Sequence, residues 1–155
     1  MKFVKFAAIA LVLPLLAGCA LGPDVEATKM MPVKGSAFHK ALHAEYVALA
    51  MDENKDADAD AAEYFNKKAI DAAGGKDVQP TKTKGSKLPK GVDDEIEAAR
   101  SALVTALVTG GKEKAPADSA KAQAMLDCWI HEEEEGDKKD SAVCHKAFEA
   151  ALAKV

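Results

Sequence analysis

Residues 116–152, PADSAKAQAMLDCWIHEEEEGDKKDSAVCHKAFEAAL, decide the fold, because they predict two amphipathic helices joined by a tight turn. Pro116 suits the first position of a helix, where its missing N–H would have no partner anyway. Met125 and Trp129 then lie one turn apart, and Gly136 ends this helix. The second helix carries an apolar face formed by Val143, Cys144, Ala147, Phe148, Ala151 and Leu152. An antiparallel helical hairpin is therefore expected.

Each helix of this hairpin carries one cysteine, Cys128 and Cys144. On one continuous helix they would lie ~24 Å apart, whereas a reversal at Gly136 brings their Cα atoms to the ~6 Å of a disulfide. In an oxidising compartment we expect the bond to form and to add ~3 kcal/mol of stability. The alternative is two separately buried thiols. Trp129 is expected to anchor the contacts of its helix, with a partly exposed ring in an interaction surface as the alternative.

Apolar residues upstream recur at helical spacing and predict three more helices. Ser36 can cap the first, and Asp60 and Glu63 are spaced like a capping box for the second. The glycine pairs at 74–75 and 110–111 end the second and third. The apolar positions are Phe38, Leu42, Tyr46 and Leu49, then Phe65, Ala69 and Ala72, then Ile96, Ala99, Leu103 and Leu107.

These segments predict an all-α protein, a small antiparallel bundle of about five helices. Only 5% of the residues are aromatic, so close packing through small side chains is expected. The first hairpin, residues 38–73, is similar to a single tetratricopeptide unit in the spacing of Ala62, Phe65 and Ala69. Because the chain contains no second copy of the unit, a solenoid is not expected.

Two charged stretches are candidate interaction surfaces. Lys82, Lys84 and Lys87 belong to a long loop over residues 74–91, a length that indicates either mobility or a function. The acidic run Glu132–Glu135 lies where a helix should end and opposes the helix dipole there. The lysines could contact anionic lipid or wall polymer, and the glutamates a basic partner or divalent ions. Two solvated surfaces are the alternative.

Metal-ligand patterns in the sequence are incomplete. His39 and His43, spaced i, i+4, are weak candidates for a metal site because no third ligand accompanies them. Asp56, Asp58 and Asp60 imitate the start of a calcium loop, but the glycine that such a loop needs is missing. A solvated turn is expected there.

The charge balance and the motifs narrow the class of function. The net charge is −4, so nucleic acid is not expected as a partner. No nucleophile with an adjacent base and no glycine-rich phosphate loop is present. We therefore expect neither enzymatic activity nor a cofactor.

The N-terminus carries the pattern of an export signal. Two lysines precede an apolar run too short to span a bilayer, and Leu16-Ala17-Gly18-Cys19 follows. This junction resembles the lipobox of bacterial lipoproteins, which implies cleavage before Cys19 and lipid on its sulfur and amino group. The expected organisation is a signal peptide over 1–18, a lipidated cysteine and flexible tether over 19–35, and a helical periplasmic domain over 36–155.

Further motifs resemble the N-terminal region of alphaproteobacterial OmpA-family lipoproteins along essentially the whole chain. They are the lipobox, FHKALHAEY at 38–46, VQP at 78–80, KLP at 87–89, KAP at 114–116 and AQAMLDCW at 122–129. In that family a Pro/Ala-rich linker and a C-terminal peptidoglycan-binding domain follow, and this sequence stops at Val155, where the linker would begin. Peptidoglycan binding is therefore not expected of this chain alone.

The resemblance implies an outer-membrane lipoprotein that faces the periplasm, since Ala20 and not aspartate follows the lipidated Cys19. We expect a structural or protein-interaction role with a partner in the cell envelope. The alternative is a periplasmic ligand-binding or metal-binding lipoprotein that uses His39 and His43.

Overall fold

The computed structural model describes residues 22–85 and 87–155, and within these ranges the fold is all helical, without strands. Five helices of 14 to 20 residues correspond to those predicted, and two short helices and a π-helical turn accompany them. The elements are α1 (Val25–Lys29), α2 (Ala37–Lys55), α3 (Ala59–Ala73), α4 (Asp93–Ala106), the turn Leu107–Gly111, α5 (Lys112–Lys114), α6 (Pro116–Glu135) and α7 (Lys138–Leu152). The predicted all-α class is confirmed. None of the described helices is long and apolar enough to cross a membrane.

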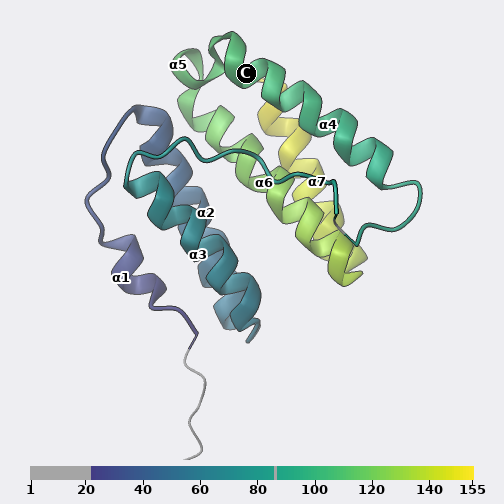
Figure 1. Cartoon of the computed structure of the whole chain (residues 1–155), viewed down its shortest axis with the longest axis horizontal. Coiled ribbons are helices and arrows are strands. Elements are labelled where there is room, and N and C mark those ends of the chain that lie inside the picture. The colour runs from purple at the N-terminus through teal and green to yellow at the C-terminus, as the bar shows by residue number, and fades with distance from the viewer. Residues whose placement is uncertain (1–21, 86) are drawn as a thin grey trace, which may run out of the picture.

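Two antiparallel hairpins, α2 with α3 and α6 with α7, lie side by side, and α4 runs along the second (Figure 1). The loop between α3 and α4 crosses both hairpins (Figure 1). Both hairpin turns point to the same end of the molecule, whereas the C-terminus lies at the opposite end (Figure 1). The end with the two turns is called the turn end below.

The first hairpin forms as the apolar spacing predicts, with a difference at its turn. Tyr46 of α2 and Phe65 of α3 are fully buried, with ring centroids 6.4 Å apart. The N-cap of α3 is Asp58, whose carboxylate accepts the N–H of Ala61 at 2.9 Å. The capping box predicted at Asp60 was therefore wrong. The extended backbone of Asp58 lets its side chain fold back on the helix, while Asp60 lies already within the first turn.

The structure differs from the tether expected over residues 19–35. Asp24 caps α1, and Val25, only 3% exposed, enters the core beside the first hairpin. The N–H of Lys34 donates to the carbonyl of Ala73 at 2.7 Å. These contacts make the segment from residue 22 onward part of the domain. The capped turn of α1 is enough to place the Val25 side chain in the core.

The second hairpin contains the predicted disulfide. Gly136 adopts the left-handed conformation that ends α6, with φ of 84°. The chain reversal brings Cys128 and Cys144 together, with their Cα atoms 5.8 Å apart, and they are bonded. The expectation of a stapled last hairpin is confirmed.

Trp129 anchors this hairpin as expected. It is only 2% exposed and stacks flat on His145 of α7, with ring centroids 3.7 Å apart and planes within 6°. Phe148 of α7 also lies near the indole, with a centroid distance of 6.2 Å and planes 39° apart. The alternative of a partly exposed ring in an interaction surface is therefore excluded for the isolated domain.

Replacing Trp129 should destabilise the domain strongly. Trp129→Ala removes the largest fully buried side chain, and we expect a loss of ~3 to 5 kcal/mol in the free energy of unfolding. Val143→Ala, at a position 62% exposed on the same hairpin, is the control and should change it by less than ~0.5 kcal/mol. Urea unfolding followed by circular dichroism measures both. Equal losses in the two variants would contradict the anchoring role.

Candidate functional site

A buried carboxylate lies at the centre of the bundle. Asp127 of α6 is 1% exposed, and its Oδ2 accepts the Tyr46 hydroxyl at 2.6 Å. Its Oδ1 accepts the backbone N–H of Thr81 at 2.8 Å. Lys68 of α3 completes the group with a salt bridge to Oδ2. One side chain thus joins α2, α3, α6 and the loop before α4.

The surroundings of this group keep Lys68 and Tyr46 protonated. Burial disfavours the Lys68 ammonium, but the charge and hydrogen bond of Asp127, together with those of Tyr64, outweigh burial and raise the pKa of Lys68. Burial and the same carboxylate raise the pKa of Tyr46 well above its ordinary value. Lys68 therefore stays charged and Tyr46 stays a hydroxyl donor. Because the contacts of Asp127 all come from within the domain, this group stabilises the fold.

The central part of the long loop, residues 76–83, is called the strap. Gln123 donates to the carbonyl of Val78 at 2.8 Å, and the Arg100 Nε donates to that of Thr81 at 2.8 Å. Lys112 pairs with Asp77 at 2.9 Å. The strap is therefore held to the bundle by hydrogen bonds from α4, α5 and α6, and these contacts stabilise the fold.

The lysines predicted as interaction residues lie on the solvent side of this loop. Lys82, Lys84 and Lys87 are all exposed. The backbone N–H of Lys87 donates to the carboxylate of Glu134 at 3.0 Å, so the loop meets the acidic run of α6. Trp129, named with them as an interaction residue, is buried in the core instead.

His39 and His43 do not form a metal site. His39 Nδ1 accepts the backbone N–H of Ser36 at 3.2 Å, which fixes the start of α2. His43 is buried and its Nδ1 donates to the carbonyl of Ala69 at 3.1 Å. Their common spacing places them one turn apart, but each ring engages a different part of the first hairpin. Within the described part of the chain, neither belongs to a group of three metal-binding side chains.

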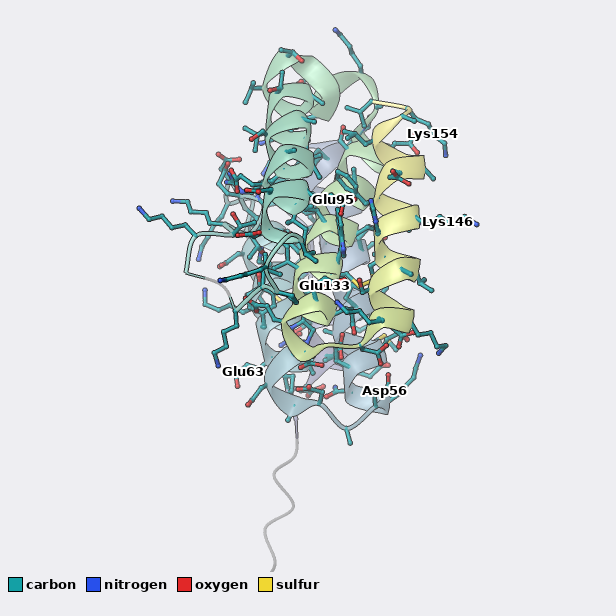
Figure 2. The ribbon with its side chains drawn as sticks, turned by 90° about the vertical axis from the view of Figure 1, so that its right-hand side faces the viewer. Asp56, Glu63, Glu95, Glu133, Lys146 and Lys154 are labelled. Atoms are coloured by element: carbon teal, nitrogen blue, oxygen red, sulfur yellow. A yellow bond between two sulfur atoms is a disulfide. The ribbon has the colours of Figure 1, made fainter. Side chains whose placement is uncertain are left out.

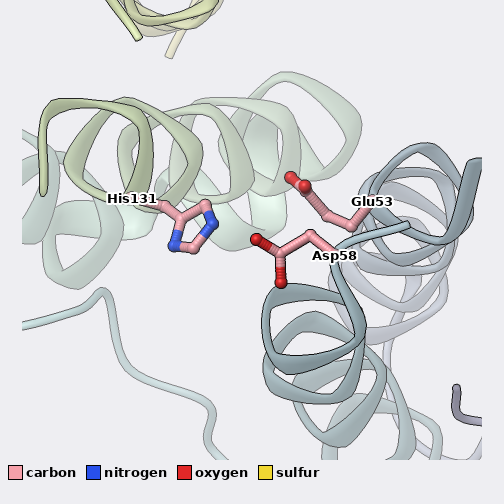
Figure 3. A group of neighbouring side chains, drawn as sticks. All are labelled: Glu53, Asp58 and His131. Atoms are coloured by element: carbon pink, nitrogen blue, oxygen red, sulfur yellow. The ribbon is translucent and has the colours of Figure 1, made fainter. Parts of the chain in front are cut away.

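A different set of ligand types meets at the turn end. Glu53 from the last turns of α2, Asp58 from the cap of α3 and His131 from α6 point toward one another (Figure 3). One donor atom from each lies within 4.8 Å of the other two. Glu135 adds a carboxylate oxygen 3.2 Å from His131 Nε2. The sequence carried no local signal for this group, because tertiary packing alone brings its three elements together.

An acidic groove of about 720 Å³ opens between the two hairpin turns. Its floor contains Leu49, Met125, Val143 and the disulfide. Asp56 marks the turn end in Figure 2, far from Lys154 near the C-terminus. The acidic residues that line the groove are Asp52, Glu53, Asp56, Asp58, Glu132, Glu135, Asp137 and Asp140.

The acidic run of α6 is only partly compensated. Glu133 is buried and accepts hydrogen bonds from Ser141 and Lys138, both at 2.5 Å. Glu132 has no such donors, and burial together with nearby carboxylates, Glu53 first, raises its pKa to about 7. The negative charge of the run is therefore compensated at Glu133 but not at Glu132.

Removing only one partner of the Asp127–Lys68 pair should destabilise the protein strongly. Asp127→Asn leaves the Lys68 ammonium buried without a counter-charge, and we expect a loss of ~3 to 5 kcal/mol in unfolding free energy. Adding Lys68→Met should restore part of it, since no unpaired charge remains. Lys67→Met, an exposed lysine one residue away, is the control and should change stability by less than ~0.5 kcal/mol. A double variant that is no more stable than Asp127→Asn would contradict a coupled pair. Urea unfolding measures all four proteins.

Glu132 should make stability depend on pH. Its folded pKa of about 7 lies above the ordinary 4.5, so the fold favours the protonated acid. This contribution is fully present below pH 4.5 and is lost as the pH rises through about 7. Glu132→Gln should therefore be more stable than the natural protein at pH 8, with a smaller difference at pH 4.5. Urea unfolding at both pH values, in EDTA and with Glu63→Gln as an exposed control, measures this. An equal difference at the two pH values would contradict it.

Comparison with known proteins yields no relative: no family model, no curated protein and no solved structure matches this chain.

Proposed function

We propose that this chain is an outer-membrane lipoprotein, anchored by lipid on Cys19, whose helical domain binds a protein partner in the periplasm. The observation that carries the proposal is the Cys128–Cys144 disulfide. Such bonds form and persist in the oxidising periplasm and are rare in the cytosol. The disulfide thus supports the same destination as the lipobox Leu16–Cys19.

The signal peptide 1–18 and Cys19 lie outside the described residues, so their support is the sequence pattern. The described residues begin at Gly22, and three residue steps from Cys19 span at most ~11 Å. Pro23 is hydrogen-bonded through its carbonyl to Asn54 near the end of α2, at 3.3 Å. A lipid anchor at Cys19 would therefore hold the turn end of the bundle close to the membrane surface.

The acidic groove is the surface best suited to a partner. It combines eight lining carboxyl groups with an apolar floor, and this favours a basic segment that also carries apolar side chains. Since the groove lies at the turn end, we propose that this segment belongs to another membrane-associated protein of the envelope. The exposed lysines 82, 84 and 87 do not line the groove. Peptidoglycan binding by this chain is not part of the proposal.

The anchor is tested by the intact mass of protein extracted from membranes. We expect a chain that begins at Cys19 and carries acyl groups, whereas an unmodified polypeptide mass would contradict the proposal. Photo-crosslinking in cells tests the partner surface. A crosslinker at Val143, which lines the groove, should capture a protein, while one at Val108, 76% exposed and outside the groove, should not. Equal capture at both positions would exclude the groove as the partner site.

A further inference from the structure

We propose that Glu53, Asp58 and His131 bind a divalent transition-metal ion, with Zn²⁺ as the reference, and that the ion joins the two helical hairpins. This inference does not rest on the lipid anchor or on a protein partner. It concerns residues that the sequence patterns did not connect.

The geometry requires only a small contraction. The three donor atoms lie within 4.8 Å of one another, whereas ligands ~2.0 to 2.2 Å from a tetrahedral Zn²⁺ lie ~3.4 Å apart. Glu53 is partly exposed and its carboxylate stands at the end of several rotatable bonds, so rotation of this side chain can shorten the donor distances. Asp58 is held by its hydrogen bond to the N–H of Ala61 through Oδ1, and a carboxylate has a second oxygen for a metal.

The imidazole of His131 supplies a second, independent observation. Its Nε2 is shielded from solvent, and although Glu135 Oε1 lies 3.2 Å away, the two atoms do not form an aligned hydrogen bond. Shielded polar atoms in proteins nearly always have a partner, and a neutral imidazole nitrogen is the commonest metal ligand. The ring also meets the buried Phe65 edge to face, with centroids 5.6 Å apart, which holds its plane. The ring of His131, whose Nε2 is shielded and makes no aligned hydrogen bond, thus points toward two carboxylates (Figure 3).

The ligand types select the class of metal. One imidazole with carboxylates suits Zn²⁺ and its first-row neighbours, while Ca²⁺ and Mg²⁺ prefer sites made of oxygen alone. Glu135, whose carboxylate oxygen lies 3.2 Å from His131 Nε2, is placed to complete a tetrahedral set. A bound cation would also neutralise part of the negative charge that gathers at the turn end.

The ion would add a link between α3 and α6. α2 packs closely on both helices, and α3 and α6 meet each other through side chains such as the Lys68–Asp127 pair and the Phe65–His131 rings. Asp58 at the start of α3 and His131 on α6 would be joined through the metal. Because the ligands converge only in the folded protein, binding should raise the melting temperature.

The experiment uses the full-length protein in detergent, purified without a histidine tag, stripped with EDTA and then dialysed. Isothermal titration calorimetry with Zn²⁺ should give one site per chain. At a Zn²⁺ concentration ~100-fold above the Kd, the melting temperature should rise by roughly 5 to 10 °C. The same concentration of Ca²⁺ should produce no comparable shift.

Variants assign the site. His131→Gln and Asp58→Asn should each weaken Zn²⁺ binding at least ~10-fold, and asparagine preserves the cap of α3. His39→Gln is the matched control, because His39 lies in the first turn of α2, at the opposite end of the helix from Glu53. This variant should bind Zn²⁺ as tightly as the natural protein does. Circular dichroism checks that each variant is folded. Absence of binding, or equal binding in His131→Gln and His39→Gln, would overturn the proposal. Binding that only Glu132→Gln weakens would assign the ion to the neighbouring Glu132, Asp137 and Asp140 instead and would also overturn it.

Discussion

The buried carboxylate of Asp127 is the constraint on which the arrangement of helices depends. A charge taken out of water is costly unless it is paired and hydrogen-bonded. Here the partners are the Lys68 ammonium, the Tyr46 hydroxyl and the N–H of Thr81, which come from α3, α2 and the strap. No one of these segments can shift along α6 without leaving the charge exposed to an apolar core. The network therefore sets the relative position of the two hairpins, which apolar packing alone specifies less sharply.

This register has a consequence at the turn end. Once Asp127 is fixed, Cys128 follows it on α6 and ties α7 in place through the disulfide. The last turns of α6, the end of α2 and the start of α3 then meet, and each brings carboxylates. Lys138 and Ser141 compensate Glu133, but the remaining acids face one another across the groove. The concentration of negative charge is thus a result of how the hairpins align, and this concentration is what makes the turn end suited to cations or basic partners.

Local patterns in the sequence predicted much of the fold. The helical spacing of residues such as Leu42 and Tyr46, the reversal at Gly136 and the pairing of Cys128 with Cys144 all depend on neighbours along the chain, and the structure confirms them. The start of α3 was misplaced because Asp58 and Asp60 both resemble caps, and only the backbone conformation separates them. The Asp127–Lys68 pair and the meeting of His131 with Glu53 could not be predicted, since each joins residues whose approach depends on packing between hairpins.

The packing of residues 24–34 on the first hairpin affects how a lipid-anchored domain would sit on a membrane. A tether over residues 19–35 would let the domain turn freely, but Val25 and Thr28 are buried against the first hairpin. The chain therefore enters the domain beside Asn54, at the same end as the acidic groove. For a lipid-anchored protein this orients the carboxylates toward the headgroups, where anionic lipid would repel them unless cations or a basic protein segment lay between. The direction of chain entry and the charge of the turn end thus favour the same two classes of ligand, a divalent ion and a basic partner close to the membrane.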